Sequence, residues 1–493
     1  MKKTERGAFF TSLKAALFAE FRLGPFLAAL GGFFAATALI LSCMDADSFS
    51  VRGVVSRILT LSLIFFFLLY FGGKRTAGRP LRDSEAYLVV IISALYIGGS
   101  VFVKGFIPEP GPVSDTALIF PASILMPTAL LVMLPAILVS PNLALLLAFV
   151  LPLGAFFTGS FDSASCFFAL VSGAASAYCL RRAQKRMDLV KAGLKIALVH
   201  CVGVSVTLLS HPPSLVNVLP DLFMAAFNGA ASGVMLTGLL PPLEYWLNAL
   251  TPFRLIELSD LNSPILRKLF TAAPGTYSHS LMVANLAEAA CQDIGANALL
   301  ARVGAYYHDI GKMEQPDYFV ENQSTQNRHD ALNPRLSATV IRSHVKLGVE
   351  KAGALGLPRE VLEIIAEHHG NSVITWFYNK ALKKEAKVNI EDFSYPGEPP
   401  RSRESAVVML ADVTEAATRT LQKPTAQRLE AFIQQLIDEK VKNGQLARSD
   451  LSFRDLDLIK KAFVRVLAGH YHTRIEYPKI VVAKGENPHE AKS

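Results

Sequence analysis

The hydrophobic positions of this chain follow two patterns that meet near residue 250. Before that point, long apolar runs are separated by short loops; afterwards the sequence is amphipathic, with apolar residues three or four positions apart. A helix that crosses a bilayer needs about 20 mostly apolar residues, whereas the second pattern is typical of helices with one buried face. The sequence therefore predicts an all-α protein, with a multi-span membrane domain followed by a helical bundle.

Eight apolar runs are long enough to be candidate transmembrane helices. They cover residues 25–43, 55–73, 86–104, 117–138, 142–160, 164–180, 192–210 and 221–247. Several contain proline or glycine, which neighbouring helices can accommodate. The predicted organisation is an N-terminal segment over 1–24, a membrane domain over 25–250, a bundle over 251–476 and a tail, expected to be disordered, over 477–493.

Basic residues predict the orientation of the membrane domain. Lys and Arg gather in the N-terminal segment and in the loops around 74–82 and 181–191, while the alternate loops are poorer in both. Because Lys and Arg favour the cytoplasmic side, we expect eight membrane crossings, with both ends in the cytoplasm. An uncleaved signal-like segment is the alternative for the first run, since Ser42-Cys43-Met44 is a weak cleavage context.

Composition excludes several classes of function. The net charge is +8, but no basic patch interleaved with aromatic residues follows the membrane domain, so no nucleic-acid polymer is expected as a partner. The five cysteines form no CxxC pair, which argues against a thiolate metal site or a disulfide framework. No Asp, Glu or Lys falls in the middle of a predicted span, and His200, the ionisable residue well inside one, is expected to be structural. These features argue against a transporter.

Glycine and proline delimit the helices of the bundle. SHSLMVANLAEAACQDIG is expected to end at Gly295, ALLARVGAYYHDIG at Gly311 and LSATVIRSHVKLGVEKAGALG at Gly356, while PREVLEIIAEHHG starts with proline and ends at Gly370. ESAVVMLADVTEAATRTL and the stretch 425–441 continue the helical series. No run of alternating strands is present, so the bundle is predicted to be entirely helical.

Five histidines and two aspartates lie on or at the ends of these helices. They are His279, His308, Asp309, His344, His368, His369 and Asp412. Imidazole together with carboxylate suits divalent Fe, Mn or Zn rather than Ca. Each residue alone has an ordinary interpretation, such as a core histidine, a histidine pair at a helix C-terminus or a pairing of Asp412 with Arg419. Together they predict a metal site that acts on phosphate.

The segments that carry these residues resemble a known family. The residues themselves look like the ligands of the HD-domain phosphohydrolase superfamily. APGTYSHSLMVANLAEAA, HDIGKMEQPDYFVENQ and IIAEHHGNSVITWFYNKA more closely resemble its seven-transmembrane HD family, the PgpH-type cyclic-di-AMP phosphodiesterases. The similarity runs from about 255 to 470, with a matching membrane region before it. The HD pair alone is also found in nucleotidases and (p)ppGpp hydrolases, and the lack of a GYP signature after the paired histidines argues against the cyclic-di-GMP branch.

The resemblance implies two divalent metal ions, Mn or Fe. One would be held by His279, His308, Asp309 and Asp412; Asp309 would bridge to a second, held by His344, His368 and His369. Asp309 and Lys312 would be the catalytic residues, with Lys312 presenting its charge to the phosphate. Substrate binding would involve Lys312, His329, Tyr378 and Arg419. The expected reaction is the hydrolysis of cyclic-di-AMP to 5′-pApA.

The chain also departs from the family that it resembles. Such proteins typically carry a large extracytoplasmic domain after the first span, where this chain has only a short loop near residues 44–56. The input signal is therefore not predicted. Two alternatives stay open: hydrolysis of another nucleotide, such as cyclic-di-GMP or (p)ppGpp, and a membrane receptor that binds a nucleotide without cutting it. The expected partners are a cyclic dinucleotide and the lipid bilayer, which the resemblance implies to be that of a bacterial inner membrane. A dimer is one option for the oligomeric state.

Overall fold

The computed structural model describes residues 82–106, 122–181, 183–210, 215–323, 327–385, 387–421 and 425–471, together with Val55 and Leu59. Within these residues the ordered elements are helices, and the β interaction found there is an isolated bridge between Val373 and Ser394. The prediction of an all-α protein is confirmed.

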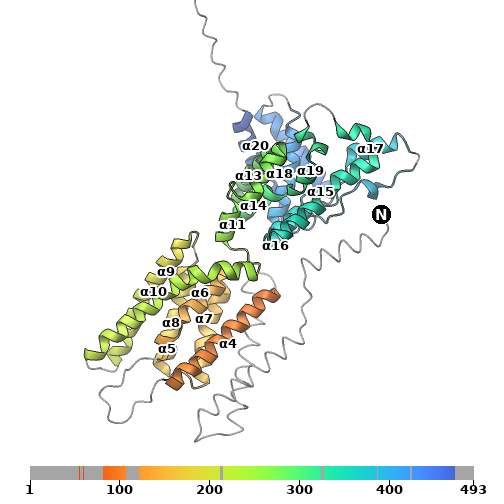
Figure 1. Cartoon of the computed structure of the whole chain (residues 1–493). Helices are drawn as coiled ribbons and strands as arrows, with labels where there is room; N and C mark the ends of the chain where they lie inside the picture. Colours follow the sequence, from red (N-terminus) through yellow and green to blue (C-terminus); the bar gives the residue numbers. More distant parts are fainter. Residues whose placement is uncertain are drawn as a thin grey trace, which may run out of the picture. The chain divides into compact units, whose positions relative to one another are not determined.

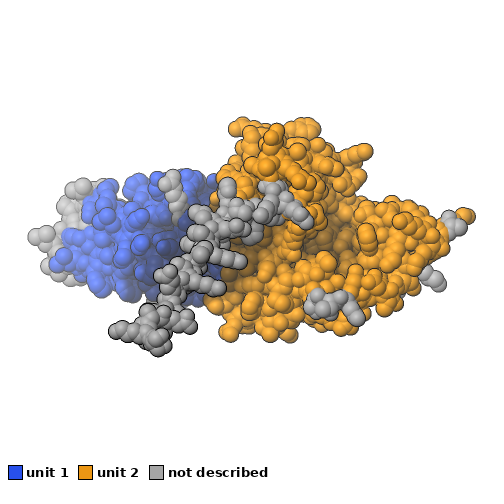
Figure 2. All heavy atoms as spheres, turned by 90° about the horizontal axis from the view of Figure 1, so that it is seen from above, with its two compact units in different colours: residues 1–260, 352–360 blue, residues 261–351, 361–493 orange. Residues whose placement is uncertain are grey.

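The chain separates into two compact units (Figure 2). Unit 1 comprises residues 1–260 and 352–360, and unit 2 comprises residues 261–351 and 361–493. The first border therefore lies at 260, where the sequence placed it at 250. The short second segment of unit 1 was not expected from the sequence.

Unit 1 is built from apolar helices (Figure 1). The described ones are α4 (Asp83–Phe106), α5 (Ala122–Leu125), α6 (Thr128–Leu138), α7 (Pro141–Phe157), α8 (Ser163–Cys179), α9 (Arg186–Ser210), α10 (Leu215–Trp246) and α11 (Pro252–Leu258). Ser84–Lys104, Arg186–Val206 and Val218–Trp246 are long and apolar enough to cross a membrane, while α6, α7 and α8 are shorter apolar helices. Large apolar side chains such as Phe102, Leu198 and Phe223 are exposed on this unit, as expected where lipid replaces water.

The predicted spans agree with these helices to different degrees. The run 25–43 lies outside the described residues, and of the run 55–73 only Val55 and Leu59 are described. The predicted span 117–138 is wrong as a continuous helix, because α5 ends at Leu125 and α6 begins at Thr128. Proline at position 127 cannot donate a backbone hydrogen bond.

The break between α5 and α6 is stabilised by Asn228 of α10. Its side-chain amide donates to the carbonyl oxygens of Ile124 (2.8 Å) and Met126 (3.1 Å). In an apolar environment such freed backbone groups need a partner. The amide of a neighbouring helix therefore makes an irregular backbone tolerable here.

Charged and polar positions in unit 1 differ partly from the prediction. Because α9 begins at Arg186, Lys195 lies well inside it rather than near its start. The prediction for His200 fits the structure: its Nε2 lies 2.7 Å from the Ser172 hydroxyl and its Nδ1 lies 3.2 Å from the Ala225 carbonyl. With both ring nitrogens bonded, His200 connects α8, α9 and α10.

The remaining helices form unit 2, with the turn between α15 and α16 assigned to unit 1. They are α12 (Pro264–Ala272), α13 (Pro274–Asp293), α14 (Ala298–Tyr307), η3 (Ile310–Glu314), η4 (Pro316–Tyr318), η5 (Val320–Asn322), η6 (Arg328–Ala331), α15 (Pro334–Ala354), α16 (Arg359–Glu367), α17 (Thr375–Leu382), η7 (Ile390–Phe393), α18 (Arg403–Thr418), α19 (Ala426–Lys442) and α20 (Phe453–Tyr471).

Glycine ends three of these helices as the sequence predicts. Gly295, Gly356 and Gly370 follow α13, α15 and α16 with φ of 67°, 65° and 53°, the left-handed conformation that favours glycine at a helix end. The prediction for Gly311 is wrong, because α14 already ends at Tyr307 and the chain continues as the 3₁₀ helix η3.

Candidate metal centre

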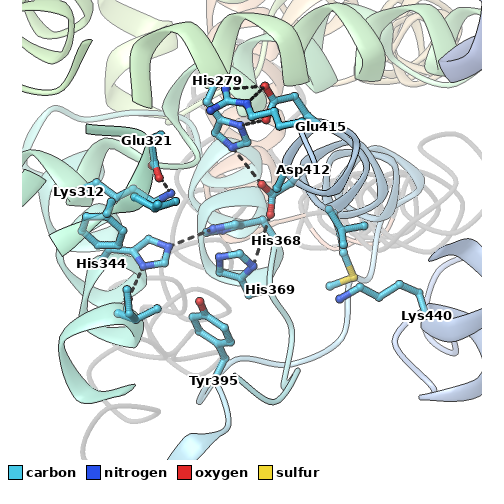
Figure 3. A pocket seen from close by; sticks show the side chains of 17 residues that line it. His279, Lys312, Glu321, His344, His368, His369, Tyr395, Asp412, Glu415 and Lys440 are labelled. Carbon is cyan, nitrogen blue, oxygen red and sulfur yellow. Dashed lines mark hydrogen bonds and ion pairs between the residues drawn. The ribbon is translucent and has the colours of Figure 1, made fainter. Parts of the chain in front are cut away.

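Five helices of unit 2 bring the seven predicted ligands together, and Figure 3 shows the side chains of His279, His344, His368, His369 and Asp412. α13 carries His279, α15 carries His344 and α18 carries Asp412, while the other four follow directly after helix ends: His308 and Asp309 after α14, and His368 and His369 after α16. All of them are buried except His369, which is half-buried.

The ligand atoms form groups that could each hold a metal ion. His279, His308 and Asp412 are one such group, His344, His368 and His369 are another, and in each group the ligand atoms lie within 4.8 Å of one another. In the first group the Nε2 atoms of His279 and His308 lie 3.0 and 3.8 Å from Oδ1 of Asp412. These are the two sets of histidines that the resemblance assigned to two separate metals.

Asp309 lies between the two groups. Its Oδ2 is 3.2 Å from Nε2 of His308 and 3.6 Å from Nε2 of His279. Its Oδ1 is 3.4 Å from Nε2 of His344 and 3.7 Å from Nε2 of His368. Each carboxylate oxygen therefore faces a different group of histidines.

Three of the histidines are oriented by the backbone of their own helices. The Nδ1 atom of His308 donates to the carbonyl of Ala305 (2.7 Å), that of His368 donates to Ile365 (2.7 Å), and that of His344 donates to Ile341. Each acceptor lies three residues earlier in the chain. A proton on Nδ1 leaves Nε2 of the neutral ring as a bare lone pair that points into the cluster, as metal-binding histidines require.

The donor set fits a metal. Nε2 of His308 and Oδ1 of Asp309 are buried and make no hydrogen bond to the part of the chain that the structure describes. Buried polar atoms that lack a hydrogen bond are costly. Imidazole nitrogens and carboxylate oxygens in this number suit Mn, Fe or Zn.

A fourth histidine, His279, is oriented by Glu415, a residue that the sequence analysis missed. Nδ1 of His279 lies 2.5 Å from Oε2 of Glu415, which is buried on α18. Glu415 comes one helical turn after Asp412 on the same apolar helix, and that spacing was the available signal. Arg419 pairs with Glu415 at 2.6 Å, so the pairing of Asp412 with Arg419 considered from the sequence is not what the structure shows.

Electrostatics differ between the two groups of histidines. Burial lowers the pKa of His344 to about 4 and that of His368 to about 3, so both rings are neutral at neutral pH. Burial also disfavours a charge on His308, but the Asp309 carboxylate prevails and raises its pKa to about 10. Burial opposes ionisation of Asp309, yet the charges of His308 and Lys312 hold its pKa well below the usual range.

Gly311 explains how Asp309 reaches the second group. A Cβ atom at this position would collide with the carbonyl oxygen of His344 and would lie 2.6 Å from the amide nitrogen of Gly348. The turn that follows Asp309 therefore packs directly against the backbone of α15. Glycine is needed here for close approach rather than for ending a helix.

Next to the cluster is a cavity of about 310 Å³ (Figure 3). Its wall contains five of the seven ligands and further polar side chains, among them Lys312, Glu321, Tyr395, Arg419 and Lys440. Tyr395 stacks on His369 with ring centroids 4.2 Å apart. Glu321, Tyr395 and Lys440 were not predicted, because no sequence spacing connects their segments with the histidines.

Of the four predicted substrate-binding residues, two line the cavity and two do not. Lys312 and Arg419 line the cavity, but Lys312 lies 2.8 Å from Oδ2 of Asp309 and 2.9 Å from Oε1 of Glu321. His329 and Tyr378 are not among the lining residues. His329 is buried against Phe377, and Tyr378 packs on Phe393.

Comparisons with known proteins match both units. A family described as "7TM receptor with intracellular HD hydrolase" matches residues 52–251, and the HD domain family matches residues 276–417. The chain belongs to the seven-transmembrane HD family. It is a membrane protein with an HD domain, and the HD match covers each of the seven predicted ligands.

Curated relatives in two bacteria are similar to this chain. It is 41% identical to the cyclic-di-AMP phosphodiesterase PgpH of Bacillus subtilis, over 65% of this chain and 46% of the relative. It is 36% identical to PgpH of Listeria monocytogenes, over 80% of this chain and 55% of the relative. The chain thus spans about half the length of the curated relatives it matches.

A solved structure is also similar. The crystal structure of the L. monocytogenes PgpH HD domain in complex with cyclic-di-AMP is 41% identical in sequence. The match covers 43% of this chain and all of that one, with a TM-score of 0.42.

Proposed function

We propose that this protein is a membrane-anchored, metal-dependent phosphodiesterase that hydrolyses cyclic-di-AMP to 5′-pApA. The observation that carries the proposal is the convergence of five imidazoles and two carboxylates beside a cavity, with Asp309 facing both groups of histidines. The relatives named above are cyclic-di-AMP phosphodiesterases. In the hydrolysis, water adds to one phosphorus, the ester bond to the 3′ oxygen breaks, and that oxygen takes up a proton.

Two divalent cations, Mn or Fe, suit the site. His279, His308, Asp309 and Asp412 would hold one, and Asp309, His344, His368 and His369 would hold the other. Such a pair makes water acidic enough to attack at neutral pH and stabilises the entering and leaving oxygens of an in-line displacement. The neutral His344 and His368 are ready to bind a cation without losing a proton.

The chain's own residues hold this arrangement in place. The helix carbonyls fix the histidine rings, and Glu415 fixes His279. Lys312 offsets the charge of Asp309 and Glu321 and links the two side chains. We further propose that the HD domain lies in the cytoplasm, because the basic loops of the membrane domain predict that side.

The test uses the full chain, purified in detergent with Mn²⁺ or Fe²⁺. Cyclic-di-AMP, cyclic-di-GMP and ppGpp are incubated with it separately, and the products are separated by chromatography. We expect pApA from cyclic-di-AMP and a loss of activity to background in Asp309→Ala. Asp450→Ala, which removes an exposed carboxylate far from the ligands in sequence, should retain wild-type activity.

Other outcomes distinguish the alternatives. Cleavage of cyclic-di-GMP or ppGpp instead would keep the metal site and reject the substrate. Tight binding of cyclic-di-AMP with no product at any metal loading would indicate a receptor. Failure to bind metal would remove the basis of the proposal.

A further inference from the structure

Three cationic side chains line the cavity, and they differ in how their charge is compensated. Lys312 is paired with Asp309 and Glu321, and Arg419 is paired with Glu415. Lys440 is different, because no acidic group lies within 4.0 Å of its ammonium among the described residues. Lys440 thus brings a positive charge to the cavity that the protein does not neutralise by direct contact.

The position of Lys440 is fixed by the turn that follows the paired histidines. Its Nζ donates to the hydroxyl of Ser372 at 3.0 Å. Ser372 is itself held on both sides, since its amide donates to the carbonyl of His369 (3.1 Å) and its carbonyl accepts from the amide of Tyr395 (3.0 Å). The ammonium therefore has a defined place beside the second group of histidines, with donors left over for a ligand.

The surroundings of Lys440 favour an anion. Figure 3 shows its side chain reaching into the cavity from α19, on the side opposite Lys312. The residue is half-buried, and burial lowers its pKa although Asp412 acts in the opposite direction. A partly desolvated ammonium with a single neutral partner is stabilised when an anion binds to it.

The proposed substrate has two phosphates, and in the proposed hydrolysis the metal ligands would serve only the one that is cut. We propose that Lys440 binds the second, non-scissile phosphate of a cyclic dinucleotide. The proposal rests on the proposed function and specifies how the site distinguishes a cyclic dinucleotide from a diester with a single phosphate. It also differs from the phosphate contact that the resemblance implied for Lys312, because the charge of Lys312 is already paired with Asp309 and Glu321.

The test compares two substrates in the full chain loaded with Mn²⁺. Cyclic-di-AMP carries two phosphates, and bis(p-nitrophenyl) phosphate carries one. Lys440→Met keeps the length of the side chain and removes its charge. We expect KM for cyclic-di-AMP to rise roughly 10- to 100-fold more than KM for the simple diester, the range of a lost hydrogen bond to a charged group. Lys440→Arg should restore most of the difference.

The matched control is Lys442→Met, which removes an exposed charge from the same helix and should change neither KM. If Lys440→Met changes both substrates by the same factor, or neither, the assignment of Lys440 is wrong while wild-type hydrolysis of cyclic-di-AMP leaves the proposed function intact. If the wild-type protein neither cleaves cyclic-di-AMP nor is inhibited by it, the proposed function fails, and the assignment of Lys440 fails with it.

Discussion

Glu415 is not one of the seven predicted metal ligands, yet its contact with His279 orients the ring of that ligand. Its carboxylate accepts from Nδ1 of His279 and also pairs with Arg419. A carboxylate in this position fixes the ring orientation and makes the other nitrogen a stronger ligand. The same side chain therefore connects the first group of histidines with the rim of the cavity.

We predict that Glu415→Ala weakens metal binding. The expected loss is roughly 10- to 100-fold in affinity, because the ring of His279 loses its partner. Glu415→Gln can still accept a hydrogen bond but carries no charge, so its metal affinity should lie between those of the wild-type protein and Glu415→Ala. Equilibrium metal titration measures the effect, and wild-type affinity in Glu415→Ala would show that the contact is not needed.

The state of His308 predicts a dependence of metal binding on pH. The pKa of about 10 in the metal-free site means that His308 carries an extra proton at pH 7 to 9. Binding through Nε2 displaces that proton, so metal affinity should rise as the pH rises through this range. His344 and His368, with pKa values of about 4 and 3, should release none.

Calorimetry in two buffers of equal pH but different ionisation enthalpy measures this release. We expect the observed heat of metal binding to differ between the buffers by about the enthalpy of at least one proton. Identical heats in both buffers would contradict the prediction.

The sequence predicted residues that act through their own chemistry, and missed residues that act through position. His308-Asp309 and the histidine pair at 368–369 each have an ordinary interpretation alone, and they are recognisable because they belong to a set of seven such residues on consecutive helices. Lys440 could not be found in this way, since a lysine in a helix is usually solvated. Only the packing of α19 against α18 brings it to the cavity, and no periodicity specifies that packing.

At the scale of elements, the close approach of η3 to α15 determines the geometry of the site. Sequence patterns predicted the helices α13, α15, α16, α18 and α19, because apolar spacing and terminal glycines are local signals. The early end of α14 was not predicted. The η3 segment that follows α14 packs against the backbone of α15 at Gly311, and α15 is distant in sequence.

We predict that Gly311→Ala disrupts the site without removing a ligand. The added methyl group would press on the backbone at His344 and Gly348, so η3 must move and Asp309 must move with it. Overpacking of this kind lowers the free energy of unfolding by about 1–3 kcal/mol. Turnover should fall strongly even where the protein stays folded, because Asp309 is displaced. Turnover and thermal unfolding of the purified protein are measured together.

Gly353→Ala is the matched control for this change. Gly353 lies on α15, and a Cβ atom there has no neighbour within 4 Å. Alanine favours a helix over glycine, so this variant should be as stable as wild type or more stable. If both variants behave alike, close approach at Gly311 is not important.

At the scale of the whole molecule, metal binding should contribute to the stability of the HD domain. Seven ligands come from five helices, so the unfolded chain cannot offer them together. A metal at 100 times its dissociation constant would stabilise the folded state by about 2.7 kcal/mol. For a domain of this size that corresponds to a rise of roughly 5–10 °C in the midpoint of its unfolding transition.

Differential scanning calorimetry with metal and with a chelator tests this expectation. The transition of the HD domain should shift, and Asp309→Ala should lose most of the shift. Equal midpoints with and without metal in the wild-type protein would show that the ligands do not act as a set.

The assignment of residues 352–360 to unit 1 has a practical meaning for anyone who dissects the chain. The carbonyl of Gly356 accepts a hydrogen bond from Arg254, and Glu360 pairs with Arg82. The polypeptide leaves unit 1 after residue 260, returns to it at 352 and leaves again after 360, so no single cut separates the units. A fragment that starts at residue 261 would lack both Arg82 and Arg254, so the turn at 352–360 would lose these two contacts. That turn joins α15, which carries His344, to α16, which His368 follows. A fragment that starts before Thr251 would keep Arg254, and is the better choice for isolating the HD domain.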